Sequence, residues 1–202
     1  MTGMPLRSLV PASWQQSWRK REVLDTYVFP VQGPGPRADG SRTLEDATEA
    51  VLDQMRRDYP DDLNERKHRL LVERLQHPAD RTLVIRDEDG EPCGYCHLTY
   101  GDTENARIHL RLRVSPREAY FWDDHVFVAH RRRGLHAFSI ARRLEILADE
   151  GKVRGVTMIS RKNRASRASY AAFGARRTRQ HVFLKDRRRT LTLPTWVEIP
   201  AR

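Results

Sequence analysis

The spacing of apolar residues predicts a strand and then a helix near the start of the chain. Residues 24–32 form a mostly apolar run that predicts a strand, and the Gly-Pro-Gly-Pro and Asp-Gly sequences within 33–40 end it. Thr43 and Asp46 then form a capping-box pair. Because apolar residues recur at helical spacing behind this pair, we expect a helix from Thr43 to about Tyr59.

The pattern next passes from helical to alternating spacing. A second helix is expected over 63–76, and its mixed acidic and basic residues indicate a solvated face. Residues 82–86 and 93–100, joined by an Asp-Gly turn, predict a β-hairpin. Apolar and polar residues alternate over 108–114, which predicts a further half-buried strand.

Strands and helices alternate from residue 119 onward. A strand over 119–128 is followed by an amphipathic helix from Gly134 to Gly151, with Arg142 and Arg143 on its polar face. The remaining expected elements are a strand over 156–159, a helix over 164–173 and two basic strands over 181–185 and 190–193. A strand–helix–strand unit of this length implies a parallel strand pair in a mixed sheet, so we predict an α/β (α+β) fold.

Length and composition indicate one folded domain. The 202 residues are 39% apolar and 32% charged, which is compatible with a single packed core. No apolar run approaches the roughly 20 residues that span a bilayer, and residues 1–14 lack the apolar centre of a secretory signal. We therefore expect a cytoplasmic protein without a membrane span. Cys93 and Cys96 are too few for a disulfide framework or a structural zinc site, so we interpret them as buried thiols and expect no metal.

Charge is distributed unevenly along the chain. The net charge is +10, but residues 1–100 contribute 14 basic and 17 acidic groups, whereas residues 101–202 contribute 23 basic and 10 acidic groups. This asymmetry would attract a polyanion to the second half, which leaves nucleic acid, anionic lipid or a phosphorylated small molecule as candidates. Of the 37 basic residues 32 are arginine, which suits phosphate contacts but also follows from biased base composition in a genome.

The segment over 126–136 joins the strand directly to the helix. It contains three consecutive arginines, 131–133, followed by Gly134. Backbone N–H groups at the start of a helix have no partner within the helix, and the helix dipole favours negative charge there. The glycine would let a ligand approach the backbone closely. This junction is therefore predicted to bind an anion.

A second motif lies downstream of this junction. Asn163 is followed by Tyr170 seven residues later and by Gly174 four residues after that. Together with Arg131 and Gly134, this spacing resembles the GCN5-related N-acetyltransferase (GNAT) family, whose phosphate loop reads Arg or Gln, two residues, Gly, one residue, Gly or Ala. The resemblance covers residues 82–185.

The resemblance implies a GNAT-like mixed, mostly antiparallel sheet with a central, splayed parallel strand pair flanked by helices. The chain 1–202 would be a single acyltransferase domain, with 1–80 on the acceptor side and 81–202 as the acyl-CoA-binding core. The implied co-substrate is acetyl-CoA or another acyl-CoA, with its pyrophosphate on the loop amides and its pantetheine arm beside the strand. The residues expected to bind it are Val126, Val128, Arg131, Arg132, Arg133, Gly134, His136, Ala137 and Asn163.

His136 departs from the family pattern, because the family has Gly or Ala at this position. It would contact a donor phosphate or simply cap the helix surface. An altered donor geometry, including an acyl-carrier protein as donor, stays open.

The implied reaction is direct attack of a primary amine on the thioester, for which alignment supplies most of the catalysis. A backbone N–H near Val128 would hold the oxyanion, and Tyr170 would protonate the departing thiolate. Attack needs a neutral amine, and we expect Asp124 to be the base because it shares its strand parity with Val126. The competing candidates are Glu118, His97, Asp123 and His125.

Two other functions are open at this point. A basic nucleic-acid-binding protein would explain the charge, although the sequence contains no helix–turn–helix, zinc-finger or aromatic stacking pattern. A non-catalytic CoA sensor would explain His136. The sequence does not identify the amine acceptor, so a small metabolite, an amino sugar, a peptide terminus and a protein lysine all stay open. Residues 101–106 and the N-terminal helices are expected to select it. An exposed edge near the C-terminus would allow a homodimer.

Overall fold

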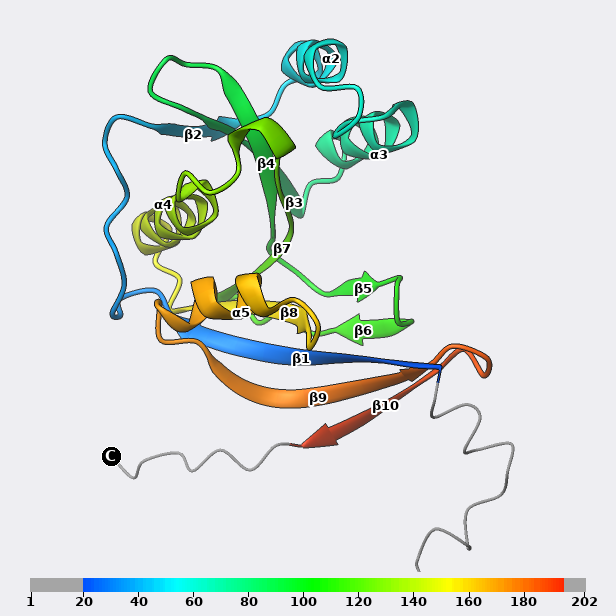
Figure 1. The fold of residues 1–202 in the computed structure, drawn as a ribbon. Helices are drawn as coiled ribbons and strands as arrows, with labels where there is room; N and C mark the ends of the chain where they lie inside the picture. The colour runs from blue at the N-terminus through cyan, green and yellow to red at the C-terminus, as the bar shows by residue number, and fades with distance from the viewer. Residues whose placement is uncertain (1–19, 195–202) are drawn as a thin grey trace, which may run out of the picture.

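The computed structural model describes residues 20–194, which form an eight-stranded sheet with helices on both faces (Figure 1). The strand order is β10-β9-β1-β8-β7-β4-β3-β2, and every neighbouring pair is antiparallel except β7 and β8. The strands are β1 (Arg21–Pro30), β2 (Thr43–Asp46), β3 (Asp80–Arg86), β4 (Pro92–Thr99), β7 (Glu118–Val126), β8 (Arg154–Ser160), β9 (Arg176–Leu184) and β10 (Arg189–Pro194). The expected mixed, mostly antiparallel sheet with one parallel pair is thus confirmed.

The helices divide between the two faces of the sheet. The long helix α4 (Leu135–Asp149) and the short α5 (Arg164–Ala171) cover one face, where Ile140, Leu144 and Tyr170 pack on strand residues such as Phe121. On the other face α2 (Glu49–Asp58) and α3 (Glu65–Leu75) pack on β3 and β4. Helices therefore cover both faces of the sheet. This is expected because apolar side chains of the strands alternate between the two faces, and each apolar face must be buried.

Two expectations about residues 43–114 are wrong in detail. Thr43–Asp46 is the edge strand β2, not the start of a helix, because it pairs with β3 in the register Leu44 to Ile85. The helix begins later, and the Thr48 hydroxyl is its cap, accepting the Val51 N–H at 3.3 Å. Only 110–112 of the strand expected over 108–114 is extended, as β6 (Leu110–Leu112) in a hairpin with β5 (Thr103–Asn105).

Arg143 corrects the expected polar face of α4. Its side chain is fully buried rather than solvated. Its guanidinium donates to the carbonyl oxygens of Ser139 and His97 and to the Asp124 carboxylate. A buried arginine is tolerated where its N–H groups find such partners.

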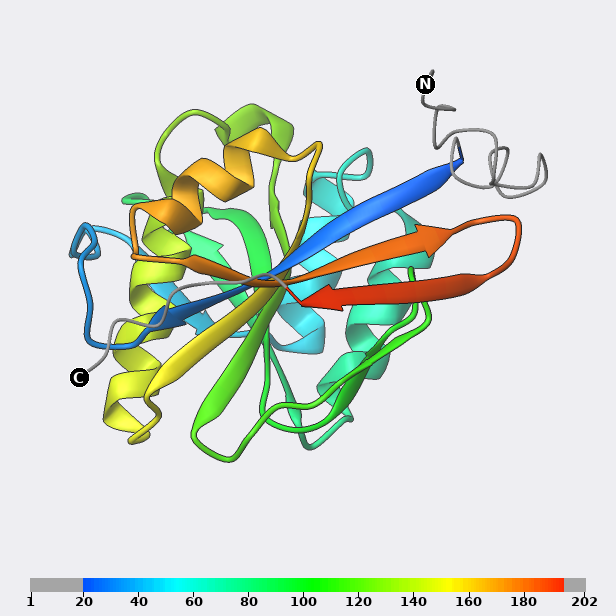
Figure 2. The same cartoon turned by 90° about the horizontal axis from the view of Figure 1, so that it is seen from below.

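The parallel strands β7 and β8 part after a short stretch of pairing. They pair only from Glu118 with Arg154 to Phe121 with Thr157. Figure 2 shows the strongly twisted sheet from below, with its strands fanning apart. The splayed pair expected from the sequence is therefore present, and it opens towards the N-termini of α4 and α5.

A β-bulge lies in β7 just beyond this point. His97 pairs with Trp122 and Tyr95 with His125, so two residues of β7 stand opposite one residue of β4. Asp123, one of these two residues, has a positive φ of 51°. As a result Trp122 and Asp123 both face α3, and Asp124 faces α4 and α5.

The ends of the chain, 1–19 and 195–202, lie outside the described residues, and so does the segment 1–14 that we interpreted as carrying no secretory signal. Within 20–194 every helix is too short or too polar to serve as a membrane span.

Candidate active site

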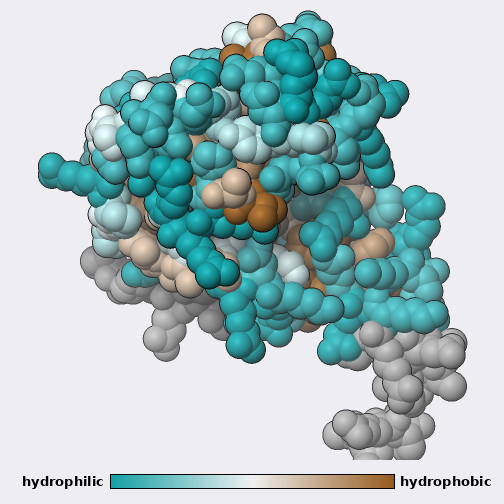
Figure 3. All heavy atoms as spheres, turned by 45° about the horizontal axis from the view of Figure 1, so that its top comes forward, coloured by the Kyte–Doolittle hydropathy of each residue, from teal (hydrophilic) through white to brown (hydrophobic). Residues whose placement is uncertain are grey.

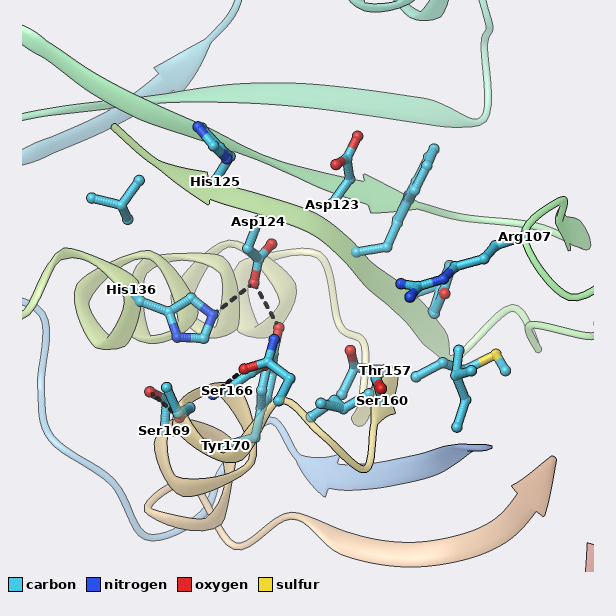
Figure 4. A pocket seen from close by; sticks show the side chains of 18 of the residues that line it. Arg107, Asp123, Asp124, His125, His136, Thr157, Ser160, Ser166, Ser169 and Tyr170 are labelled. Atoms are coloured by element: carbon cyan, nitrogen blue, oxygen red, sulfur yellow. Dashed lines mark hydrogen bonds and ion pairs between the residues drawn. The ribbon is translucent and has the colours of Figure 1, made fainter. Parts of the chain in front are cut away.

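A cleft of about 1260 Å³ runs along the splayed part of β7 and β8. Its walls come from the loop before α4, from α5, from α3 and from the β5–β6 hairpin. Figure 4 shows that Asp124, His136 and Tyr170 gather below β7, whereas Asp123 and His125 lie on its upper side. The bulge in β7 thus gives the cleft two differently built sides.

The start of α4 has the features of an anion site. Gly134 caps the helix in the left-handed region, with φ 76°. Among the described residues, no hydrogen bond satisfies the backbone N–H groups of residues 134–137, which include Ala137. Four unpaired N–H groups at the positive end of a helix dipole favour a phosphate. The junction expected from the sequence therefore has the local geometry for a pyrophosphate.

The three arginines of this loop have three different environments. Arg131 folds back, and its Nε donates to the Val126 carbonyl at 3.1 Å. Arg133 is paired with Glu88 at 2.9 Å and with Asp87 at 3.3 Å. Arg132, with a φ of 64°, is exposed and has no hydrogen bond or ion pair within residues 20–194. Arg132 is therefore the arginine with the freest charge for a ligand.

A possible metal-ligand group lies behind this loop. Three atoms of ligand type, one each from Asp87, Cys93 and His130, lie within 4.8 Å of one another. The guanidinium of Arg133 already lies 3.3 Å from both the Asp87 carboxylate and His130 Nδ1, and burial raises the pKa of the Cys93 thiol to about 11. Asp87 is thus neutralised by an arginine, and the thiol is protonated. As it stands, the group is an ion-pair cluster.

The donor side of the cleft is built around one carboxylate. Asp124 Oδ2 accepts hydrogen bonds from Arg143 at 2.8 Å, from the Tyr170 hydroxyl at 2.9 Å and from His136 Nε2 at 3.1 Å. The His136 ring also packs edge-on against Tyr170. His136 thus points into the cleft towards Asp124, which differs from the expected contact with a phosphate or the helix surface. Asp124 Oδ1, in contrast, is buried without a hydrogen-bond partner within residues 20–194.

These contacts change the proton affinities of both expected catalytic residues. Burial alone would raise the pKa of Asp124, but the Arg143 and His136 groups outweigh it and hold that pKa well below its usual range. Burial and the charge of Asp124 raise the pKa of Tyr170 well above its usual value. Asp124 is therefore a weak proton acceptor. Tyr170 stays protonated, with its hydroxyl directed at Asp124.

The acceptor side carries a second charged group. Asp123 Oδ2 lies 2.6 Å from Lys67 Nζ and 2.5 Å from Arg74, both on α3. Arg74 also donates to His97 Nε2 at 2.9 Å and stacks on Trp122. Burial and the charge of Arg74 lower the pKa of His97 to about 3, so it is neutral and accepts this bond. Neither Asp123 nor His97 is free to take a proton.

His125 differs from these competitors. It lines the cleft, its side chain is 29% exposed, and its Nε2 lies 3.0 Å from Asp62 Oδ1. The other oxygen of Asp62 accepts the Val128 N–H at 3.0 Å, and the Tyr95 ring stacks on the imidazole. A carboxylate only accepts, so Nε2 carries the hydrogen and Nδ1 is the acceptor nitrogen. Asp62 therefore occupies the Val128 N–H, a backbone group that the sequence suggested for binding the oxyanion.

The comparisons with known proteins agree with this architecture. The model of the Acetyltransferase (GNAT) family matches residues 48–175, more than half of the chain. The chain belongs to this family. A search of curated proteins gave no match.

Several solved structures share the GNAT fold with this chain. A GNAT-family protein from Novosphingobium aromaticivorans aligns with a TM-score of 0.54 and 16% identity over 87% of this chain and 66% of that one. A GCN5-related N-acetyltransferase from Sphaerobacter thermophilus aligns with a TM-score of 0.55 and 10% identity, over 95% and 59%. A conserved protein of unknown function from Staphylococcus epidermidis gives 0.59 and 9%, over 86% and 66%. This chain therefore spans less than two thirds of their lengths.

Of the remaining sequence candidates of this GNAT protein, Val126 and Asn163 line the cleft, whereas Val128 and Glu118 are not part of its lining. Val126 ends β7, and Val128 is exposed in a 3₁₀ turn, Val128–His130, so the expected strand ends two residues early. Asn163 lines the cleft, and its side-chain oxygen caps α5 by accepting the Ser166 N–H. Glu118 lies at the closed end of β7 and pairs with Arg154.

Four residues of the GNAT site are not predicted by the sequence. Lys67 and Arg74 belong to the helix interpreted as a solvated face, and Arg143 was assigned to the polar face of its own helix. Asp62 belongs to a short loop between helices. The one sequence feature that indicates their role is spacing: Lys67 and Arg74 are two helical turns apart, which places them on the same face of α3.

Proposed function

We propose that this protein is an N-acyltransferase that transfers an acyl group, in the simplest case acetyl, from a CoA thioester to a primary amine. Transfer takes place by direct attack in a ternary complex. The observation that carries the proposal is that two features lie on opposite sides of one cleft: four backbone amides at the start of α4 that have no partner among residues 20–194, and the His125–Asp62 pair. The first is suited to a diphosphate and the second to an amine that must lose a proton.

The donor would bind along the α4 and α5 side. The amides of residues 134–137 would hold the pyrophosphate, and Arg132 would add attraction from solvent. The pantetheine arm would run between Val126 and Asn163. Asp124 Oδ1, which has no hydrogen-bond partner within the described part of the chain, supports this path, because a buried carboxylate oxygen is stabilised by an N–H of a bound reactant.

The proton of the amine would pass to His125 Nδ1. Asp62 would hold the ring in the tautomer that leaves Nδ1 free, and it would stabilise the imidazolium that forms. The amine nitrogen attacks the thioester carbon, the new C–N bond forms, and the C–S bond breaks. In this scheme Asp124 is a positioning group rather than the base that the sequence suggested.

The departing thiolate would take its proton from Tyr170 or from water. Rotation of the Tyr170 O–H about its C–O bond would turn the hydrogen from Asp124 towards the sulfur. Asp124 would keep its bonds to Arg143 and His136 during this step. The same network would hold the ring in place before transfer.

Donor binding and thiol release together test this proposal. Acetyl-CoA should raise the melting temperature of the protein, because a ligand at about 100 times its Kd stabilises by roughly 2.7 kcal/mol. CoA thiol should be released when a suitable amine is added. Binding without release from any amine indicates a CoA sensor, and salt-sensitive binding of DNA or RNA without CoA affinity indicates a nucleic-acid-binding protein. Either result contradicts the proposal.

Ala137→Asp and Ala148→Asp are a matched pair for locating the donor. The first places a carboxylate at the start of α4, where it favours the helix but repels a pyrophosphate. The second places the same group at the exposed far end of the helix. We expect only Ala137→Asp to abolish the thermal shift by acetyl-CoA. Equal shifts in both variants would place the donor elsewhere.

Along the outer edge of the sheet, the terminal strand β10 has an unpaired edge within the described residues. Pairing of two copies there would give the homodimer suggested by the sequence. Gel filtration of the purified protein measures this assembly.

A further inference from the structure

A second cavity, of about 730 Å³, adjoins the cleft at the β5–β6 hairpin. It lies where β1 begins and where β8 and β9 end. Arg107, Ser160 and Asn163 line both spaces, so the two lie side by side. Figure 3 shows a hollowed surface that is rimmed mainly by hydrophilic side chains.

The charge of this basic cavity is strongly one-sided. Glu22 is the single acidic residue among the described residues that line it. The basic residues of the lining are Arg21, Arg107, Arg161, Lys162 and Lys185.

Local ion pairs neutralise only part of this charge. Glu22 pairs with Arg107, and Arg161 lies 3.2 Å from the buried Asp25. Lys162 and Lys185 are exposed, and neither has a side-chain hydrogen bond or ion pair within residues 20–194. Two ammonium groups therefore face the cavity mouth without compensation, which favours an anion.

The path from this cavity to His125 also carries excess positive charge. Lys67 and Arg74 share the single carboxylate of Asp123. An acceptor with several positive charges would meet like charge along this wall. An acceptor with an anionic end would be attracted, and its amine would be directed inwards.

We propose that the acceptor is a small amine whose far end carries a phosphate or carboxylate group, and that the basic cavity binds this group. The inference rests on the proposed N-acyltransferase function and names its substrate class. The donor phosphates have their own site at the start of α4, on the opposite face of the sheet from the β5–β6 hairpin. Lysine and arginine in a shallow cavity suit phosphate and carboxylate alike, so the experiment separates the two groups.

Matched acceptors test the proposal. Thiol release from acetyl-CoA is measured with ethanolamine, O-phosphoethanolamine, β-alanine and putrescine, and with glucosamine and its 6-phosphate. We expect kcat/KM for a phosphate- or carboxylate-bearing amine to exceed that of its neutral counterpart by about tenfold or more, as for a charge-assisted hydrogen bond. Putrescine should be the poorest acceptor.

Charge reversal locates the effect. Lys162→Glu and Lys185→Glu should remove most of the advantage of the anionic acceptor while leaving the Kd of acetyl-CoA unchanged. Arg69→Glu, an equal charge change on the exposed side of α3 and outside both cavities, should keep the advantage.

The outcomes separate this inference from the function on which it rests. Equal rates for neutral and anionic amines overturn the inference and leave acyl transfer intact. Weaker acetyl-CoA binding in Lys185→Glu assigns the cavity to the donor and also overturns it. If no amine releases thiol, the proposed function fails, and calorimetry with inorganic pyrophosphate in saturating CoA shows separately whether the cavity binds an anion.

Discussion

The two sides of β7 carry the same types of charged residue but use them differently. On the donor side Asp124, Arg143 and Tyr170 are almost completely buried, and three donors converge on one oxygen. On the acceptor side Asp123 and His125 are about a quarter exposed and border the open cleft. The buried network fixes the strand and its neighbours, whereas the open side leaves a nitrogen that substrate can reach. Whether a charged side chain positions its neighbours or reacts with substrate therefore depends more on its burial than on its residue type.

The largest effect should come from breaking the buried side. Asp124→Ala leaves Arg143 buried without its counter-charge, so we expect the free energy of unfolding to fall by about 3–5 kcal/mol. Urea denaturation measures this change. The control is the double variant Asp124→Leu with Arg143→Met, which removes both charges and should recover much of the loss. A change below 1 kcal/mol in Asp124→Ala would contradict the buried ion pair.

The same network makes stability depend on acid. Because the pKa of Asp124 in the folded protein lies below its value in the unfolded chain, its contribution is complete above about pH 4 and is lost as the pH falls towards the lowered pKa. We expect the urea midpoint of the wild type to fall with acidification below pH 4. Asp124→Ala should lack this component of the fall. Parallel curves for the two proteins would contradict the lowered pKa.

On the open side the effect should fall on turnover. His125→Gln removes the proton acceptor, so we expect kcat to fall by about 10²–10⁴-fold with little change in unfolding free energy. His109→Gln, on the β5–β6 turn and outside the cleft lining, is the control. A fall in stability without a fall in kcat would indicate a structural role only.

Asp62→Asn should have a smaller effect than loss of the imidazole. The amide can still accept the Val128 N–H but stabilises an imidazolium less, so we expect kcat to fall by about tenfold. If Asp62 acts through His125, the double variant should be no slower than His125→Gln alone. Independent, multiplying losses would show that the two residues do not work together.

The smallest effect is expected at the loop arginines. Arg132→Ala should weaken acetyl-CoA binding only about 1.4- to 5-fold, as for an exposed charge worth about 0.2–1 kcal/mol, and the difference should shrink at high salt. Arg133→Ala should change donor affinity less, because Glu88 and Asp87 already hold that side chain. Calorimetry at two salt concentrations compares them. The reverse order would mean that the loop rearranges when the donor binds.

Local patterns were sufficient for most of the sheet and for the strand-to-helix junction at Gly134. They failed where partners distant in sequence decide the outcome. Thr43–Asp46 has a helical start signal, but pairing with β3 makes it a strand. Arg143 occupies a polar helix position, yet the carboxylate that permits its burial lies in β7. On α3, the two basic residues that face the cleft cannot be told from solvent-facing ones without their common partner, Asp123.

The bulge in β7 has a consequence for sequence change in this family. Alternation along a strand has a period of two, and Trp122 and Asp123 both face α3, so deleting either one would restore regular pairing. Asp124 would still face Arg143, and His125 would still face Asp62. The bulge therefore adds one side chain to the α3 side of β7, and a one-codon change can remove it without exchanging the two faces of the strand.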